Sequence, residues 1–292
     1  MSEQQRHDVY TIVTNRIIEL LEAGCVPWQQ PWQSGQPPMN LLSKNPYRGI
    51  NLLLLNALGY EQPYYLTWKQ VNELGATVKK GERSRFVVFW QKKEKSDEAI
   101  EQSGNTSKKT VLRYYSVFNI EQCLDIPAHL IPELPPLQEV QPIDRCVEVV
   151  SRMQHPPKII FKGNEAYYAP HEDVITIPKQ KSFTTAESFY HTLFHELVHS
   201  TGHPSRLDRK EIATPDNFAS ESYSIEELTA EIGASFLNAH TGITQATINN
   251  SAAYIASWLK VLRGDKRFVV FASSKAQKAV DFILNIQDST MG

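Results

Sequence analysis

Hydrophobic residues recur at helical spacing near the start of the chain, at positions 9, 12, 13, 17, 18 and 21, which are all Val, Ile or Leu. This period places them on one face of a helix, and Gly24 is expected to end that helix. Shorter apolar patterns predict two further helices, at 51–58 and 67–74. The first part of the chain is therefore expected to begin with helical segments.

Two runs of β-branched and aromatic residues follow, at 86–90 and 111–118. Runs of this composition are typical of strands. The stretch between them, 95–109, is polar throughout and is expected to form the mobile tip of a hairpin. Helices and paired strands together predict an α+β domain.

The second part of the chain mixes short strands with longer helices. Its strands are expected at 158–161, 166–168 and 174–177. A hydroxyl at Thr184 and a carboxylate at Glu187 form a capping box, which predicts a helix running to Gly202. Other helices are expected at 146–153, 224–239, 252–262 and 273–286. The chain as a whole is α+β.

A boundary between these parts is marked by four prolines between Pro127 and Pro136. Proline lacks an amide donor and restricts its predecessor, so this stretch cannot be a continuous helix or central strand. We expect a domain at 1–125, a linker at 126–139 and a second domain at 140–292.

Composition narrows the class of protein. Of the 292 residues, 41% are hydrophobic and 21% are charged, as in ordinary soluble globular chains. No apolar stretch is long enough for a membrane span, and the N-terminus does not resemble a secretory signal. Three widely spaced cysteines favour reduced thiols over a disulfide framework. These features predict a cytoplasmic protein without a membrane partner.

The motif with the clearest chemistry is His195-Glu196-Leu-Val-His199. Two histidines four residues apart on a helix share a face and can both bind one zinc ion. Glu196 lies beside that face and is expected to act as the general base on a metal-bound water. The alternative is a buried helix whose histidines are satisfied by backbone groups. His191 and His203 also flank this face and are expected to be solvated or capping.

A second pair of residues, both glutamates, supports the prediction of a metal site. Glu227 and Glu231 are four apart on a predicted helix with several large apolar residues, where two buried carboxylates would repel each other without a cation. H-E-x-x-H followed by E-x-x-A-E resembles the glutamate-type zincin metallopeptidases. That resemblance implies one Zn²⁺ per chain, or another divalent transition metal, bound by His195, His199 and Glu227, with Glu231 orienting one imidazole. In zincins an edge strand lines the cleft; residues 173–178 fit either such a strand or a plain structural one.

Basic and aromatic residues are interleaved in the first half: between Lys44 and Lys95 there are ten Lys and Arg against four Asp and Glu. Cations neutralise phosphates and aromatic faces stack on unpaired bases, so this pattern favours single-stranded DNA. The alternative is that the basic run is only a solvated turn and that the tryptophans lie in the core, above all Trp28 and Trp32. The expected DNA-binding residues are Lys44, Tyr47, Arg48, Trp68, Lys80, Arg83 and Arg85.

Several ordered motifs resemble ArdC-type antirestriction proteins over nearly the whole chain. They include Asn45-Pro-Tyr-Arg-Gly-Ile-Asn51, Val78-Lys-Lys-Gly-Glu82 and the segment from His195 to His203. The resemblance implies a plasmid-borne protein with an N-terminal single-stranded-DNA-binding domain and a C-terminal zincin-like metalloprotease domain. It also implies protection of incoming conjugative DNA from host restriction.

The leading hypothesis is thus a zinc peptidase that acts on an unidentified protein near single-stranded DNA. A second hypothesis is a DNA-binding protein with a structural metal that acts by occlusion. A metal-dependent hydrolase of DNA is a third, although phosphodiester chemistry usually uses paired metals among many carboxylates, and no such cluster is evident in the sequence.

Overall fold

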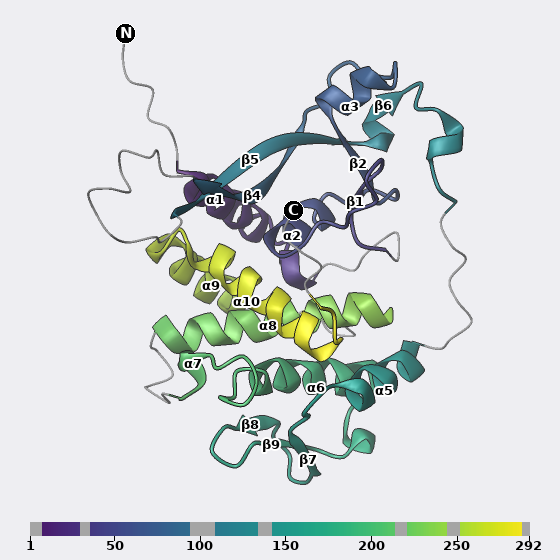
Figure 1. Ribbon diagram of the computed structural model, residues 1–292. Helices are drawn as coiled ribbons and strands as arrows, with labels where there is room; N and C mark the ends of the chain where they lie inside the picture. The colour runs from purple at the N-terminus through teal and green to yellow at the C-terminus, as the bar shows by residue number, and fades with distance from the viewer. Residues whose placement is uncertain are drawn as a thin grey trace, which may run out of the picture.

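The computed structural model describes residues 8–29, 36–93, 109–133, 142–213, 221–243 and 252–287. We call residues 8–133 the N-terminal lobe and residues 142–287 the C-terminal lobe. In Figure 1 the N-terminal lobe lies above and the C-terminal helices lie below it. Residues 95–108 of the predicted hairpin tip, Trp32 and residues 134–139 of the predicted linker fall outside the described residues.

The N-terminal lobe has a four-stranded sheet in the order β1-β2-β5-β4. The long pair β4–β5 is antiparallel, with Val87 opposite Tyr115. A capping box between Thr67 and Gln70 starts α3 directly after β2. The elements are α1 (Val9–Glu22), η1 (Pro27–Gln29), β1 (Met39–Asn40), α2 (Ile50–Asn56), β2 (Tyr64–Thr67), α3 (Trp68–Glu73), β3 (Thr77–Val78), β4 (Arg85–Lys93), β5 (Lys109–Asn119), η2 (Ile120–Gln122), β6 (Cys123–Leu124) and η3 (Ala128–Leu130).

The C-terminal lobe places a small sheet against a helical layer. Its elements are α5 (Pro142–Arg152), β7 (Lys158–Phe161), β8 (Tyr167–Ala169), β9 (Val174–Ile177), η4 (Gln180–Ser182), α6 (Ala186–Ser200), α7 (Lys210–Ala213), α8 (Glu221–Thr241), α9 (Ala252–Gly264) and α10 (Phe268–Ile283). Helices α6 and α8 pack against each other, and α10 packs on α8. The chain therefore has the α+β class that its patterns predict.

One open alternative is decided and one local prediction is wrong. Of the two interpretations of residues 173–178, the edge strand is excluded, because β9 lies between β7 and β8 and pairs with both. On its antiparallel side β9 pairs with β8, which is an edge strand of this sheet. The N-cap of α6 is Thr185, whose hydroxyl accepts the backbone N–H of Ser188, rather than Thr184 paired with Glu187. Thr184 and Thr185 each carry a hydroxyl that could cap the helix. The backbone conformation places Thr185 at the N-cap position.

The two lobes share a hydrophobic core. Helix α1 packs on α9 and α10, and α2 packs on α10. The ring of Trp28 meets that of Trp258 edge-on at 5.9 Å. Polar contacts cross the same boundary: Arg48 pairs with Asp281, and Gln277 accepts the backbone N–H of Gly49 at 2.9 Å. Each lobe thus covers apolar surface of the other.

Within the described residues, no helix is both long and apolar enough to cross a bilayer.

Candidate metal centre

Three side chains from α6 and α8 bring their donor atoms to one point. The Nε2 atoms of His195 and His199 are 3.1 Å apart. Glu227 places one carboxylate oxygen 3.6 Å from His195 Nε2 and the other 3.5 Å from His199 Nε2. Tetrahedral ligands at zinc distances of about 2.0–2.1 Å are separated by roughly 3.3 Å. The three donors therefore have the spacing that one divalent ion requires.

Close packing of α6 on α8 produces this convergence. Val198 and Leu197 of α6 are fully buried, as are Leu228 and Ile232 of α8. Gly233 removes the side chain from the point where α8 meets Val198, since a Cβ there would lie 2.7 Å from Val198 Cγ2. The short distance between the helices lets a glutamate side chain from α8 reach the imidazoles on α6.

A buried ion pair orients one of the imidazoles. Glu226 Oε1 lies 3.1 Å from His199 Nδ1, and Arg209 donates to both oxygens of Glu226 at 2.9 and 2.6 Å. A carboxylate at Nδ1 favours the tautomer with its proton there, which leaves the Nε2 lone pair free for a metal. Although burial raises the pKa of Glu226, the hydrogen bonds from His199 and Arg209 bring it to about 2.

Arg209 is itself fixed by the end of α6. It donates to the carbonyl of Val198 at 2.8 Å and to the hydroxyl of Thr201 at 2.6 Å, and its side chain is 6% exposed. Sequence reasoning did not select Glu226 or Arg209 as site residues. The available signal was an arginine in the loop after the motif and a second glutamate beside Glu227.

Glu231 lies near His195. Burial lowers the pKa of His195, but the hydrogen bond with Glu227 and the charges of Glu231 and Glu196 raise it to about 9. Burial raises the pKa of the Glu231 carboxyl, while the charge of His195 and the nearby Tyr254 of α9 act in the opposite direction. With Glu226 neutralised by Arg209, the remaining charges of Glu196, Glu227 and Glu231 make the site strongly attractive to a cation.

The predicted general base follows His195 directly on α6. Glu196 is 7% exposed, and its charge reaches the His195 ring. Glu196 is not one of the three residues whose donor atoms converge.

Arg206 joins the small sheet to α6. It donates to the carbonyl of Ser200 at 2.7 Å and to the hydroxyl of Tyr168 at 3.2 Å, and it pairs with Asp173. Tyr168 is in β8 and Asp173 precedes β9, so one buried cation holds both strands beside the C-terminal end of α6. The edge strand β8 is thereby fixed relative to the donors.

The two flanking histidines have other partners. His191 Nδ1 accepts the amide of Asn238 at 2.8 Å, and burial together with the His195 charge lowers its pKa to about 4. The ring of His203 contacts the hydroxyl of Ser205 at 2.7 Å and accepts the backbone N–H of the same residue. His203 therefore caps a turn, whereas His191 is a partly buried neutral ring.

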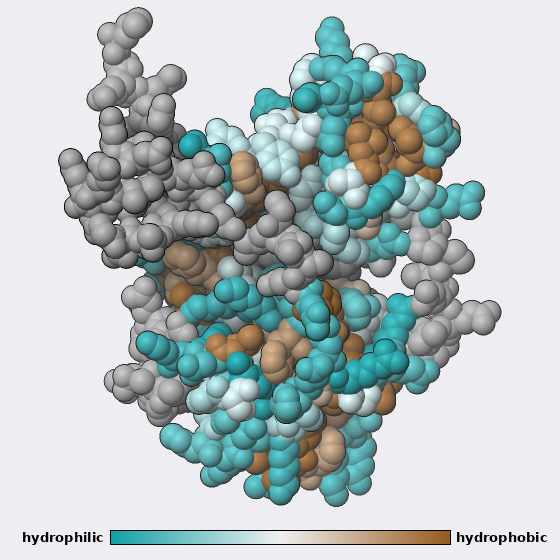
Figure 2. All heavy atoms as spheres, viewed as in Figure 1, coloured by the Kyte–Doolittle hydropathy of each residue, from teal (hydrophilic) through white to brown (hydrophobic). Residues whose placement is uncertain are grey.

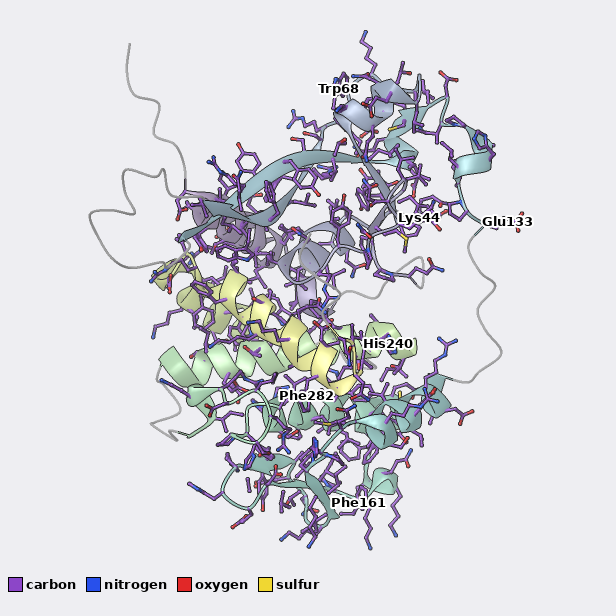
Figure 3. All side chains as sticks on the ribbon, in the orientation of Figure 1. Lys44, Trp68, Glu133, Phe161, His240 and Phe282 are labelled. Carbon is purple, nitrogen blue, oxygen red and sulfur yellow. The ribbon has the colours of Figure 1, made fainter. Side chains whose placement is uncertain are left out.

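The expected DNA-binding residues do not all lie at the surface. Trp68 is 54% exposed, and Lys44, Lys80 and Arg83 are exposed as well. Figure 3 places Trp68 and Lys44 on the N-terminal lobe, away from the C-terminal helices. Arg85 is partly buried and donates to the hydroxyl of Tyr60 at 3.5 Å.

Tyr47 and Trp28 are core residues. Tyr47 is 8% exposed and packs edge-on against Tyr65, so it offers no ring face to a base. Trp28 is 1% exposed and belongs to the core that the lobes share. Arg48 is occupied by its pair with Asp281 at the boundary between the lobes.

The hairpin β4–β5 exposes aromatic rings that sequence reasoning did not single out. Those exposed by more than a third are Phe89, Trp90, Tyr114 and Tyr115. Tyr115 packs on Phe89 at 5.7 Å across the strand pair. Arg113, opposite Phe89, adds an exposed cation on the same face. The described surface in the view of Figure 2 is mostly hydrophilic, with separate apolar areas on both lobes.

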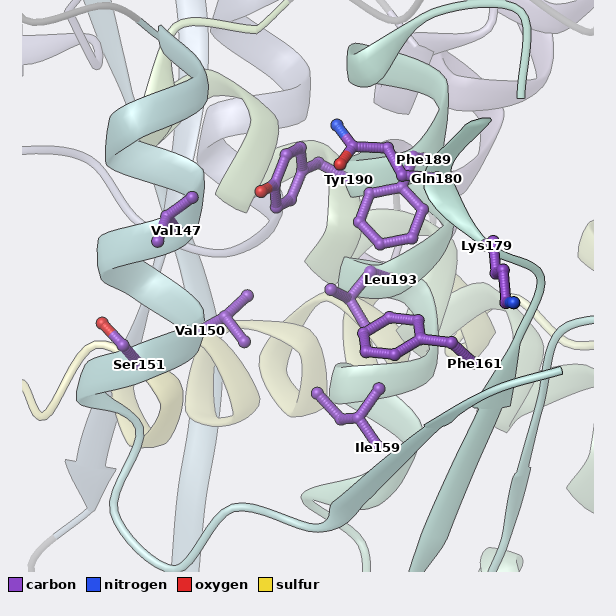
Figure 4. A pocket seen from close by; sticks show the side chains of 10 residues that line it. All are labelled: Val147, Val150, Ser151, Ile159, Phe161, Lys179, Gln180, Phe189, Tyr190 and Leu193. Atoms are coloured by element: carbon purple, nitrogen blue, oxygen red, sulfur yellow. The ribbon is translucent and has the colours of Figure 1, made fainter. Parts of the chain in front are cut away.

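A separate apolar pocket of about 530 Å³ lies between α5, β7 and α6. Figure 4 shows Val150, Ile159, Phe161 and Leu193 around it. None of the three donor residues lines it. This pocket is therefore separate from the metal centre.

The two parts of the chain match two families. Residues 7–118 match the N-terminal domain of anti-restriction factor ArdC, and residues 151–275 match the zincin-like metallopeptidases. The protein y4eC of Sinorhizobium fredii (strain NBRC 101917 / NGR234) is 34% identical, over 94% of this chain and 91% of its own length.

Longer and solved relatives also match. A DNA primase TraC of Escherichia coli is 36% identical over 93% of this chain, which spans only 26% of that primase. The metal-free crystal structure of antirestriction ArdC protein from plasmid R388 superposes with a TM-score of 0.75 at 36% identity, covering 95% of this chain and 97% of that one. Its Mn(II)-bound structure gives a TM-score of 0.74.

Proposed function

The chain belongs to the ArdC family of antirestriction proteins, and from that membership and the geometry of α6 and α8 we propose that it is a zinc-dependent peptidase that binds single-stranded DNA. In this proposal it acts in the cytoplasm on a protein held near incoming conjugative DNA and so protects that DNA from restriction. The observation that carries the proposal is the convergence of His195, His199 and Glu227 beside a buried Glu196.

Two imidazoles and one carboxylate are the ligand set of catalytic zinc sites, in which the fourth position stays open. Structural zinc is usually closed by four Cys or His ligands, and the described residues offer three donors here. The Mn(II)-bound structure of the ArdC relative from R388 supports a divalent metal ion in a protein of this fold. We assign His195, His199 and Glu227 as the ligands and zinc as the resident ion.

A bound zinc ion would polarise a scissile carbonyl and lower the pKa of a coordinated water toward about 7. Glu196 then accepts the proton of the attacking water and delivers it to the leaving amine. Glu226 and Arg209 keep the proton of His199 on Nδ1 during the reaction. In this proposal Glu231 orients the imidazole of His195.

The position of strand β8 favours a peptide as the substrate. It stands at one end of the small sheet and packs on α6, and Tyr167 of this strand is 45% exposed. An extended peptide can add to such an edge through backbone hydrogen bonds, which accept many sequences. This arrangement would place a peptide bond beside the donors.

DNA binding is proposed for the exposed residues of the N-terminal lobe. Lys44, Lys80, Arg83 and Arg113 supply charge, and Trp68 with the exposed rings of β4–β5 supplies stacking surfaces. Such mixed surfaces bind single strands with little sequence preference. Tyr47 is left out of this set because its ring is buried.

The decisive experiment compares the full chain with Glu196→Gln. Both are loaded with Zn²⁺, mixed with single-stranded DNA and a defined peptide library, and analysed by mass spectrometry. The variant should keep its zinc, since Glu196 is not a ligand, and should cleave at least about 100-fold more slowly. Tyr190→Phe, on the same helix but away from the donors, is the matched control.

The same pair of chains is tested for protection of conjugating DNA in a restricting recipient. Loss of protection in Glu196→Gln supports a peptidase role. Full protection with no detectable cleavage by the wild-type chain overturns it in favour of occlusion by a DNA-binding protein with a structural metal.

A further inference from the structure

Three aromatic rings from three elements meet where the two lobes join. The ring of Tyr10 in α1 lies 6.2 Å from that of Trp90 in β4 and 6.0 Å from that of Phe271 in α10, measured between centroids. Trp90 is 40% exposed and Phe271 is 37% exposed, so both rings offer surface to a ligand. We call these three rings the boundary cluster.

The hairpin β4–β5 leads to this cluster. Trp90 pairs with Leu112, and two residues earlier Val88 pairs with Tyr114. Side chains two residues apart on a strand share a face, so Trp90 and Tyr114 project from the same face of the hairpin. Tyr114 is 51% exposed. A row of accessible rings therefore runs from the N-terminal lobe across the boundary to α10.

Helix α10 continues the row with positive charges. Arg267 is its N-cap residue, in helical conformation, and its carbonyl accepts the N–H of Phe271 at 3.1 Å. At about 100° per residue, Arg267, Lys275 and Lys278 lie within about 80° of one another around the helix axis, and Phe271 lies inside that arc. These four residues, which we call the α10 stripe, extend over roughly 16 Å of the axis. Arg267 and Lys278 are exposed, and Lys275 is partly exposed.

The C-terminal end of the α10 stripe borders a pocket of about 410 Å³. Lys275 and Lys278 line it from α10, and residues 207–210 line it from the turn that leads into α7. Lys210 is exposed and adds a third cation, while the exposed Asp208 offsets part of this charge. The pocket therefore extends the positive charge of the stripe toward α7.

The same pocket borders the support of the metal centre. Arg209 lines it and donates to Glu226 at 2.9 and 2.6 Å, and Glu226 lies 3.1 Å from His199 Nδ1. Figure 1 shows α10 between the N-terminal lobe and α8, and α10 packs on helices of both lobes. The stripe thus leads from the hairpin of the N-terminal lobe to the back of the metal centre.

Charge is uneven within the C-terminal lobe in the same sense. Residues 140–251 carry nine Lys and Arg against fourteen Asp and Glu, whereas residues 252–287 carry six against two. Of those two acids, Asp265 lies 3.5 Å from Arg267 and Asp281 pairs with Arg48. Helices α9 and α10 therefore form a basic surface on an otherwise acidic lobe, which suits an anionic partner.

A single strand of nucleic acid matches this combination of rings and cations. Its phosphates need cations and its unpaired bases need aromatic faces, whereas an acidic peptide would use the cations alone. We propose that single-stranded DNA bound on the β4–β5 hairpin continues over the boundary cluster and along the α10 stripe to the pocket behind the metal centre. This proposal rests on the DNA binding of the proposed function. A protein attached to the strand is then held against the lobe that cleaves it.

The first test replaces the ring that α10 adds. Phe271→Leu keeps an apolar side chain against Tyr10 but has no π face, and thermal unfolding checks that the variant is folded. Binding of a fluorescent oligothymidylate of about 20 nucleotides, longer than one typical site, is measured by anisotropy on the full chain. We expect about 5- to 150-fold weaker binding, the range for the loss of one stacked base. Phe161→Leu, a 50% exposed ring that Figure 3 places at the foot of the C-terminal lobe, should bind as the wild type does.

The second test removes charges from the stripe. Arg267→Ala and Lys278→Ala each remove one exposed cation, so each should reduce the log–log salt slope by about 0.7, as expected for one lost phosphate contact. The double variant should reduce the slope by about 1.4. Lys162→Ala removes an exposed cation next to Phe161 and should leave the slope unchanged.

The outcomes separate this inference from the proposed function. If all three stripe variants bind the strand as the wild type does while Trp68→Ala binds more weakly, the inference is overturned and the DNA surface is confined to the N-terminal lobe. Stripe variants that bind DNA normally but cleave the peptide library more slowly also overturn it, in favour of an acidic protein segment on α10. A wild-type chain that binds no single-stranded DNA overturns both the inference and the DNA binding of the proposed function.

Discussion

Gly233 of α8 faces Val198 of α6 at a distance that leaves no room for a side chain: a Cβ on Gly233 would meet Val198 Cγ2 at 2.7 Å. The contact lies where the helix of the histidines meets the helix of Glu227. Two helices at this separation are a condition for the three donor atoms to converge.

We therefore expect Gly233→Ala to push α8 away from α6. Overpacking of this kind lowers the free energy of unfolding by about 1–3 kcal/mol. It should also weaken Zn²⁺ binding, because Glu227 moves away with α8. Thermal unfolding and chelator competition measure the two effects. Gly264→Ala on α9, where an added Cβ meets nothing within 4 Å, is the control and should neither lower the stability nor weaken Zn²⁺ binding.

The ion pair of Glu226 with Arg209 allows the positioning and ligand roles to be separated. Glu227→Ala should abolish Zn²⁺ binding, since a ligand is removed. Glu226→Ala should retain the ion at about 10- to 100-fold lower affinity. It should also lower the free energy of unfolding by about 3–5 kcal/mol, because a buried Arg209 loses its partner.

Elemental analysis and denaturant unfolding of the two variants make this comparison. Full zinc occupancy in Glu227→Ala would show that the third ligand is misassigned. A stability loss in Glu226→Ala with unchanged metal affinity would limit Glu226 to a structural role.

His191 predicts a pH dependence of stability. Its folded-state pKa of about 4 lies below the ordinary value, so between about pH 4 and 6.5 the unfolded chain binds more protons at this site. The contribution of His191 to stability is complete above about pH 6.5 and is lost as the pH falls toward 4.

The measurement is the Tm of the metal-free chain from pH 4 to 7, compared with His191→Gln. The glutamine keeps an acceptor for Asn238 but does not titrate, so its curve should be flatter. His171→Gln, at an exposed position beside β9, should follow the wild-type curve. Parallel curves for wild type and His191→Gln would contradict the prediction.

DNA binding should separate into stacking and charge contributions. Trp68→Ala removes an exposed ring and should weaken binding to single-stranded DNA by about 1–3 kcal/mol, with little change in the salt slope. Lys80→Ala should instead reduce the log–log salt slope by about 0.7, since one phosphate contact is lost.

These affinities are measured on the full chain, because residues 1–125 alone would expose the faces of α1 and α2 that pack on α9 and α10. Tyr47→Phe is the control, since its buried ring cannot reach DNA. Salt-independent affinity, or equal binding by Trp68→Ala and wild type, would remove these residues from the DNA surface.

Helical period alone predicted the two pairs of candidate residues, whereas the choice of Glu227 as the third ligand came from the resemblance to the glutamate-type zincins. His195 with His199, and Glu227 with Glu231, are four apart, so each pair shares a face whatever the tertiary fold. Period alone does not say which carboxylate serves which imidazole. Glu226 and Glu227 are neighbours about 100° apart on α8, and only the packing of α8 on α6 shows that Glu226 meets His199 Nδ1.

Other features depended on contacts distant in sequence. The order of three short strands cannot be read from their spacing, and β9 proved central. Tyr47 stands in a basic, turn-like segment that suggested exposure, yet the sheet behind it covers its ring. Phe89 and Tyr115 look like core strand residues in sequence and are exposed on the hairpin. Whether each of these rings is buried depends on which face of the sheet other parts of the chain cover.

The core shared by α1, α2, α9 and α10 has a consequence for how this family can spread among genes. A recombination event that joined only one of the two matched regions to another reading frame would leave an uncovered apolar face on the product. We therefore expect the whole stretch from α1 to α10 to be transferred as one unit. The match to TraC, which covers 93% of this chain within a much longer primase, has the extent expected of such an undivided cassette.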